Sequence, residues 1–262
     1  MQKIIDIIFL SYAKTEHLKN LTIQSIDTLL NSEDPEKILF NIVVVESNKS
    51  MAPYQFENTN TIYPEEEFGF HKFLNIGIRA TSNQYVCLCN NDLIFHKSWA
   101  SEILKAIDND PTASSITPYC PIFHKKNGFS ADGAPIEGYF GLLTGWCIFV
   151  KRDIFNTIGY LDENFKFWYC DYDYTKTLEK FKVKNILVPA SKVTHIGSES
   201  LNTLNKREYN KLTQLPRFYF NYKWHHRSII RYKASLLKYR ITEFLAFLQE
   251  KYFFTLKQSS KN

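Results

Sequence analysis

The sequence predicts an α/β protein built on a parallel sheet, and three observations lead to this prediction. Two continuous apolar runs, residues 3–10 and 38–45, have the composition of strands that are buried on both faces. Between them, residues 17–31 place apolar side chains at helical spacing. A further helix-like segment at 70–80 is followed by a third apolar run at 84–89. This repeated strand–helix–strand order is typical of parallel sheets covered by helices.

The second half of the chain continues with shorter elements. Ser98 is a candidate N-cap for a helix that runs to about Ile107. A short helix is expected to end at Gly159, because glycine favours the backbone conformation that closes a helix. The other expected elements are a strand at 114–119, a Gly-rich loop at 124–143, a strand at 145–151, the short helix at 152–158, a helix at 171–182 and a strand at 184–189.

Composition limits the class of protein. With 262 residues, of which 44% are hydrophobic, the chain fits one packed domain with an appendage. The five cysteines form no CxxC pair, so we expect buried thiols and a reducing cytoplasm rather than a disulfide framework or a zinc site. The opening MQKIIDIIFLSY predicts a first strand, not a signal peptide. No apolar run reaches the length of a membrane span.

Charge divides the chain into two expected parts. Residues 203–262 hold 13 Lys and Arg against 3 Asp and Glu, a net of +10, whereas residues 1–202 carry −5. We therefore expect a catalytic domain at 1–202 and a basic, aromatic, mainly helical extension at 203–262. From Ser228 onward, apolar residues share one helical face and alternate with Arg and Lys. Such a tail can bind an anionic membrane surface or nucleic acid, or pack on its own domain or a second subunit.

Polar clusters directly follow predicted strands. They are Glu46 after the second strand and Asn90-Asn91-Asp92 after the third, and Asp171-Tyr172-Asp173 opens a predicted helix. In an open parallel sheet, ligands bind beyond the carboxyl ends of the strands, where the first two clusters are expected. Asn and Asp also favour plain turns, so each cluster alone is weak evidence for a site.

Three longer segments carry a family resemblance. They are EFGFHKFLNIGIRATSNQYVCLCNND, LTGWCIFVKRDIFNTIGYLDENFKFWYCDYD and VTHIGSES. In their order and spacing they resemble family 2 glycosyltransferases, with similarity to bacterial or phage rhamnosyltransferase-like members. The resemblance covers roughly residues 3–200, and it is weaker in the tail beyond residue 203.

The resemblance implies a GT-A fold, which is a Rossmann-like α/β sandwich. It implies transfer of a sugar from a nucleoside-diphosphate sugar to an acceptor hydroxyl, with inversion and with a divalent cation, Mn or Mg. A tail that lies on an anionic membrane would suit a glycan or lipid-linked acceptor in surface polysaccharide synthesis, in an enzyme that is cytoplasmic or peripheral at the membrane. A modified DNA base is an alternative acceptor, given the basic tail.

The resemblance also assigns roles to residues of the motifs. Asp171 corresponds to the acid expected to act as the general base. Asp92 takes the position of the last acid of the DxD motif, and His195 that of the closing His, so both are candidate metal ligands. The expected donor-binding residues are Ser11, Glu46, Asn75, Asn91 and Asp92. The expected acceptor-side residues are Gly145, Trp146 and Asp173.

Ordinary structural roles compete with several of these assignments. Asp171 and Asp173 also suit the first turn of a helix, where the helix dipole favours acids. Trp146 is nearly as well explained as a core residue, and Asn75 as a solvated helix residue. His195 could simply pack after a strand.

The sequence departs from the family pattern at two positions. Asn90-Asn91-Asp92 has one carboxylate where the DxD motif has two, and Cys170 stands where the Glu of the acidic pair is expected. Both changes remove negative charge, which weakens the case for strict metal dependence. Two other classes remain. A nucleotidyltransferase is disfavoured, since the loop Ser11-Tyr12-Ala13-Lys14 lacks glycine. A non-catalytic sugar-binding module is disfavoured because Asp92, Asp171 and His195 are all retained.

Overall fold

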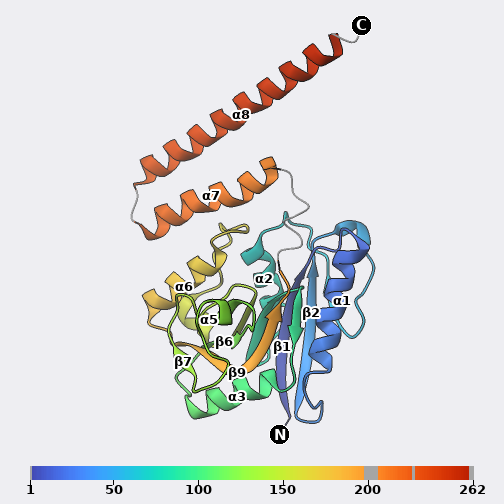
Figure 1. Ribbon diagram of the computed structural model, residues 1–262, viewed down its shortest axis with the longest axis vertical. Helices are drawn as coiled ribbons and strands as arrows, with labels where there is room; N and C mark the ends of the chain where they lie inside the picture. The colour runs from blue at the N-terminus through green and yellow to red at the C-terminus, as the bar shows by residue number, and fades with distance from the viewer. Residues whose placement is uncertain (1, 198–205, 226–227, 260–262) are drawn as a thin grey trace.

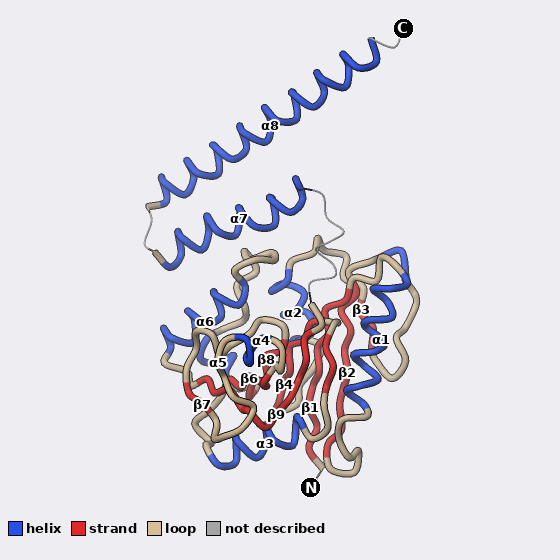
Figure 2. The backbone as a smooth tube through the Cα atoms, viewed as in Figure 1, coloured by secondary structure: helices blue, strands red, loops and turns tan. Residues whose placement is uncertain are grey.

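A computed structural model of the protein describes residues 2–197, 206–225 and 228–259. It contains a nine-stranded mixed sheet with helices on both sides, and two C-terminal helices that lie beyond one edge of the sheet (Figures 1 and 2). The α/β prediction is confirmed. The motif VTHIGSES is described only as far as Gly197, so its last three residues lie outside the described part of the chain.

The first half of the chain forms the parallel part of the sheet, in the spatial order β3-β2-β1-β4. Its elements are β1 (Lys3–Ser11), α1 (Glu16–Leu30), β2 (Ile38–Glu46), the 3-10 turn η1 (Lys49–Met51), β3 (Asn60–Ile62), α2 (Phe70–Arg79) and β4 (Tyr85–Asn90). β1 pairs in parallel with both β2 and β4. The predicted strand–helix–strand order is therefore confirmed, and the ends of the five predicted elements shift by only about one residue, while η1 and β3 were not predicted.

The second half adds a mixed part to the sheet, in the order β8-β6-β9-β5. Its elements are β5 (Leu93–Phe95), α3 (Trp99–Asn109), β6 (Ser115–Tyr119), α4 (Phe123–Lys126), β7 (Ile136–Glu137), β8 (Cys147–Lys151), α5 (Ile154–Ile158), α6 (Cys170–Phe181) and β9 (Asn185–His195). β8 is antiparallel to both β4 and β6, whereas β6 and β9 are parallel. The expected parallel arrangement therefore holds for β1, β2, β3 and β4 and between β6 and β9, whereas β8, β5 and β7 each run antiparallel to a neighbouring strand.

Two further expectations are corrected. The segment predicted as the loop 124–143 contains most of α4 and all of β7. The last strand does not stop at Pro189 but continues to His195, because buried and exposed side chains alternate after the proline, as in a half-buried strand.

The start of α3 also differs from the prediction. Ser98 occupies the N-cap position, but its φ of 63° is left-handed and its side chain makes no capping hydrogen bond. Glu33 caps the helix instead, since its Oε1 accepts hydrogen bonds from the amides of Ala100 (2.8 Å) and Ser101 (3.1 Å). A carboxylate from another segment can therefore replace the local cap at a helix N-terminus.

The hydrophobic core lies on both faces of the sheet. Along β1, Ile5 and Ile7 belong to the cluster on one face and Ile8 to the cluster on the other, as the alternation of strand side chains requires. α2 packs very close to β1 at Gly77, where an added Cβ would lie 2.4 Å from Cγ2 of Ile8. Only glycine allows that approach.

The C-terminal extension is helical, as predicted. α7 (Lys206–Trp224) lies over the carboxyl edge of the sheet, and α8 (Ile229–Ser259) packs on the outer side of α7 (Figure 1). The described helices include none that is both long enough and apolar enough to cross a bilayer.

A buried ion pair joins the two halves of the domain at the opposite, amino edge of the sheet. Asp6 is fully buried in β1, and its Oδ2 lies 2.7 Å from a guanidinium nitrogen of Arg152, which follows β8. The guanidinium also donates to the carbonyls of Ile78 and Asn83. Asn41 and Asn83 donate to the same carboxylate, so the buried charge is well solvated by protein groups.

We predict that Arg152→Met lowers the free energy of unfolding by roughly 3–5 kcal/mol, because it leaves Asp6 buried without its cation. The matched control is Lys166→Met, which breaks an exposed pair with Glu67 and should cost about 0–1 kcal/mol. Urea unfolding of both variants measures the difference. Equal losses in the two variants would show that the buried pair does not tie the halves together.

Candidate active site

The ends of five strands meet at the carboxyl edge of the sheet. Ser11 and Glu46 are register partners at the ends of β1 and β2. At the end of β4, the amide of Asn90 donates to the carbonyl of Trp146, 2.8 Å away, just before β8 begins. β9 ends at the same edge with His195. Antiparallel β8 thus brings its first residues to the edge where the parallel strands end.

Asp92 and His195 form a pair at this edge. Pairing of β5 with β9 sets Leu93 opposite His195, so the preceding Asp92 lies beside the imidazole. His195 Nε2 is 3.1 Å from Oδ2 of Asp92. Asp92 Oδ1 and His195 Nε2 are nonetheless buried and form no hydrogen bond in the described part of the chain. Buried polar atoms are rarely left without partners, so these two atoms indicate a place for a ligand.

Trp146 and Gly145 connect this pair to Asp171. The ring of Trp146 stacks on His195 with centroids 4.6 Å apart and planes inclined by 5°. A Cβ added to the neighbouring Gly145 would lie 3.0 Å from Cβ of Asp171. Neighbouring residues therefore lead from Asp92 through His195, Trp146 and Gly145 to Asp171, and they come from three separate motifs.

Asp171 lies in the first turn of α6, where the helix dipole favours a negative charge. Its Oδ1 accepts a hydrogen bond from the amide of Tyr172 at 2.8 Å. Burial raises the pKa of Asp171 above the ordinary range of an aspartate, and this effect outweighs the stabilising backbone hydrogen bonds. A carboxylate with a raised pKa is a stronger base once it is ionised.

Glu46 is fully buried but has one free carboxylate oxygen. Its Oε1 accepts hydrogen bonds from the amides of Ala13 (3.1 Å) and Asn48 (2.6 Å). Its Oε2 is buried without a hydrogen-bond partner among the described residues. This oxygen can accept a hydrogen bond from a ligand at the edge of the sheet.

Two of the expected donor-binding residues, Ser11 and Asn91, form hydrogen bonds with side chains of the protein itself. Ser11 and Thr22 share a hydrogen bond of 2.9 Å between their hydroxyls, and the amide of Asn91 donates to the same Thr22 oxygen at 2.8 Å. The carbonyl of Asn91 accepts a hydrogen bond from Ser25. These bonds fasten the Asn90–Asp92 turn to α1. The side chains of Ser11 and Asn91 therefore hold the Asn90–Asp92 turn in place, and their hydrogen bonds go to α1 rather than toward a ligand.

The hydrogen bonds of Asn75 go to the loop before α6, whereas the expected role was beside the donor. Asn75 is fully buried, and its side chain exchanges hydrogen bonds with the backbone of Leu161 at 2.8 and 3.1 Å. Its amide also donates to Glu163. Asn75 thus holds the loop before α6 in place, because its two-sided amide matches the two polar groups of one backbone residue.

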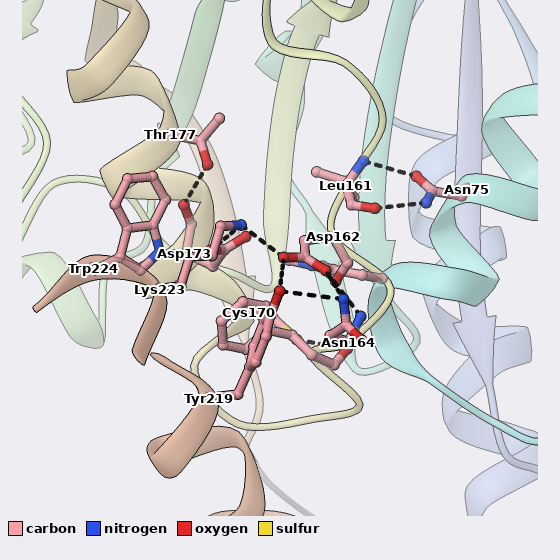
Figure 3. A network of polar contacts seen from close by, with 12 residues as sticks. Asn75, Leu161, Asp162, Asn164, Cys170, Asp173, Thr177, Tyr219, Lys223 and Trp224 are labelled. Atoms are coloured by element: carbon pink, nitrogen blue, oxygen red, sulfur yellow. Dashed lines mark hydrogen bonds and ion pairs between the residues drawn. The ribbon is translucent and has the colours of Figure 1, made fainter. Parts of the chain in front are cut away.

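Asp173 lies against Lys223 and Trp224 of the C-terminal extension (Figure 3). Its Oδ1 lies 2.7 Å from Nε1 of Trp224 and 2.8 Å from Nζ of Lys223. The same Lys223 lies 2.8 Å from Oδ2 of Asp162, which also accepts a hydrogen bond from Tyr219. Asp173 is only 2% exposed, and its carboxylate is bound to α7, so the structure does not bring it together with Asp92 and His195.

This network was not visible in the sequence. It joins α7 to the helix that begins with Cys170 and Asp171, and it borders a cavity of about 220 Å³ between α6 and α7. No sequence signal pointed to it, because the lysines nearest in sequence to Asp162 and Asp173, Lys166 and Lys176, pair with Glu67 and Glu179 instead. Removing one partner of a buried charge pair is costly, so α7 is a firmly attached part of the domain.

Three cysteine thiols lie beneath the cluster, inside the sheet. The Sγ atoms of Cys87 and Cys147 are 3.7 Å apart, and those of Cys87 and Cys89 are 3.4 Å apart. Burial raises the pKa of Cys87 and of Cys89 well above the ordinary value. The thiols of Cys87 and Cys89 therefore stay neutral and pack like small apolar side chains. The expectation of buried free cysteines is confirmed.

Comparisons with solved structures show the same fold. The chain matches GalNAc-T7 with UDP, GalNAc and Mn2+ at a TM-score of 0.61 and 14% identity, covering 84% of this chain and 50% of that one. For mannosyltransferase PcManGT from Pyrobaculum calidifontis, in complex with GDP-Man and Mn2+, the TM-score is 0.55, the identity 15% and the coverages 83% and 61%. The chain thus spans about half to three fifths of those proteins.

A third structure, S. aureus TarS 1-349, matches with a TM-score of 0.56 and 12% identity, covering 87% of this chain and 74% of that one. A search of curated protein sequences finds no significant match. The family described as Glycosyl transferase family 2 matches residues 16–159, which is more than half of the chain and includes the Asn90–Asp92 turn and Trp146. The chain therefore belongs to glycosyl transferase family 2 and has the GT-A fold.

Proposed function

We propose that the protein is an inverting glycosyltransferase that moves a sugar from a nucleoside-diphosphate sugar to an acceptor hydroxyl. The observation that supports this most is the line of neighbouring residues from Asp92 to Asp171. This line links Asp92 and His195, whose Oδ1 and Nε2 atoms are buried without hydrogen-bond partners among the described residues, to Asp171, a carboxylate of raised pKa. Transfer from a diphosphate requires these two functions together, namely charge neutralisation at the leaving group and a base at the acceptor.

In this proposal Asp171 is the general base. Its carboxylate takes the proton of the acceptor hydroxyl while the hydroxyl oxygen forms a bond to the anomeric carbon. The bond from that carbon to the diphosphate breaks on the opposite face, which inverts the anomeric centre. Gly145 has no side chain, and this lets Asp171 lie close to the start of β8.

Asp92 and His195 are proposed to hold a divalent cation, Mn or Mg. The donor set fits, because Asp92 Oδ1 and His195 Nε2 are both buried and lack hydrogen-bond partners in the described chain. Such a cation would stabilise the negative charge on the departing diphosphate. Two of the similar structures were solved with Mn2+, which supports the choice of metal. The stacked Trp146 would keep the imidazole in place.

Glu46 is proposed to recognise the base of the donor. Its free oxygen is an acceptor and therefore favours a base with a ring N–H, as in uracil, thymine or guanine. Cytosine, which has an unprotonated ring nitrogen at the corresponding edge, would fit less well. The similar structures that contain UDP and GDP-Man are compatible with this preference.

For the acceptor we propose a glycan hydroxyl, either lipid-linked or on a growing surface polysaccharide. A modified DNA base is the second candidate because the extension carries a net +10. The exposed apolar side chains of α8 favour the first, since binding to DNA phosphates does not need them.

We predict that Asp171→Asn abolishes sugar transfer while the affinity for the donor nucleotide stays within about twofold. The wild-type kcat/KM should fall as pH decreases, with an apparent pKa above the ordinary aspartate value of about 3.9, because the base must be ionised. Burial disfavours the ionised carboxylate, so the neutral Asn should leave the melting temperature at neutral pH unchanged or higher. Transfer rates, calorimetric donor binding and thermal unfolding give the three values.

The control is Asp108→Asn on the exposed side of α3, which should change neither transfer nor stability. Retained transfer in Asp171→Asn would remove this residue as the base. Loss of donor binding in that variant would instead assign Asp171 to the donor site.

We also predict that Gly145→Ala lowers kcat by roughly tenfold. The new Cβ would lie 3.0 Å from Cβ of Asp171 and must push it aside by a few tenths of an ångström, and catalysis is sensitive to such shifts. Donor affinity and melting temperature should stay near the wild-type values, which separates displacement of the base from misfolding. An unchanged kcat would contradict the proposed closeness of Gly145 to the reacting groups.

A further inference from the structure

Helix α8 has an exposed apolar stripe on the side that faces away from α7. Six side chains form this stripe between residues 230 and 248, spaced one, three, four or seven residues apart. They are Ile230 (76% exposed), Leu237 (60%), Ile241 (50%), Phe244 (60%), Leu245 (53%) and Leu248 (43%). At about 100° per residue they lie within roughly one third of the helix circumference. Contiguous exposed apolar surface of this kind marks a binding surface.

The contact between α8 and α7 uses a different face of α8. Tyr232 stacks on Tyr222 with ring centroids 5.1 Å apart and meets Tyr219 edge-on at 6.1 Å. Tyr239 meets Phe218 edge-on at 6.3 Å. Tyr232 and Tyr239 are seven residues apart, on the side of the helix opposite the apolar stripe. The attachment to the domain therefore leaves the stripe uncovered.

Cationic side chains border the stripe along both sides. Arg231 and Lys238 lie along one border and Lys233 and Arg240 along the other, and all four are exposed. Long cationic side chains at the edges of an apolar helix face can extend their charges to lipid headgroups while their stems lie along acyl chains. An anionic surface adds about fivefold in affinity for each such residue.

The charge of the extension argues against a second copy of the chain as the occupant. Residues 203–262 carry a net +10, so two copies joined through this stripe would bring like charges together. Nucleic acid would satisfy the charges but would leave the six apolar side chains in water. An anionic lipid bilayer satisfies both parts of the pattern.

We propose that the apolar stripe of α8 and its two cationic borders form a docking surface for an anionic lipid bilayer. The helix lies in the plane of the headgroups, with the stripe toward the acyl chains and Tyr232 and Tyr239 toward the protein. α7 and α8 lie on the side of the domain where the parallel strands end, so the bilayer faces the edge that carries Asp92 and Asp171 (Figure 1). The inference rests on α8 and goes beyond the proposed transfer reaction.

Co-sedimentation with vesicles tests the surface without using catalysis. The full chain should sediment with vesicles that contain about 30% phosphatidylglycerol, and much less with phosphatidylcholine alone. Raising the salt from 0.05 to 0.5 M should weaken binding, because the screening length falls to several ångströms. Leu237→Glu/Phe244→Glu should lower the vesicle affinity by roughly tenfold or more, since both side chains leave the acyl region.

The matched control is Leu39→Glu, which changes an exposed leucine (45%) at the amino edge of the sheet and should bind vesicles like the wild type. The substituted α8 residues are exposed, so melting temperatures should agree among all three proteins. Vesicle binding that survives Leu237→Glu/Phe244→Glu would overturn the proposal. Two other results would also overturn it, if the wild type does not bind vesicles. One is a wild-type dimer in light scattering that the double variant loses, and the other is binding of the wild type to duplex DNA that the double variant loses.

Discussion

Parallel pairing of β1 with both β2 and β4 is the constraint on which the candidate site depends. It brings the ends of three strands to one edge, so that Ser11, Glu46 and the turn before Asp92 come together although they are far apart in sequence. The single antiparallel strand beside them, β8, starts at that edge and contributes Trp146. The ligand site of an open α/β sheet follows from this arrangement of strand ends.

At the carboxyl edge of the sheet, hydrogen bonds hold the backbone firmly, but several buried polar atoms have no hydrogen-bond partner among the described residues. Hydrogen bonds to Thr22 and Ser25 fix the turn that carries Asp92, while Asp92 Oδ1, His195 Nε2 and Glu46 Oε2 remain buried without hydrogen-bond partners among the described residues. Leaving such atoms unpaired costs stability, which a bound ligand would recover. The extension strengthens this support from the other side, because Lys223 and Trp224 hold α6 through Asp173.

Much of the fold could be predicted from the sequence, because continuous apolar runs and helical spacing are local signals. The direction of β8 could not, since an apolar run of five residues has the same pattern in either direction. Asp92, His195 and Asp171 follow strand and helix ends and were identified from their motifs. Asn75 and Asp173 were assigned by motif position too, yet their hydrogen bonds go to Leu161 and to Lys223, partners about 50 or more residues away. Such long-range partners leave no periodic signal in a single sequence.

The most direct test of the transferase account is thermal unfolding with UDP, dTDP, GDP and CMP sugars, each with and without Mn2+. A donor at 100 times its dissociation constant should add about 2.7 kcal/mol to the stability of the folded protein. The account predicts a clear rise in melting temperature with one sugar nucleotide other than a CMP sugar, and a larger rise when Mn2+ is present. In Asp92→Asn, Mn2+ should not increase the rise. Absence of any rise with all four donors would contradict a nucleotide-sugar site at this edge.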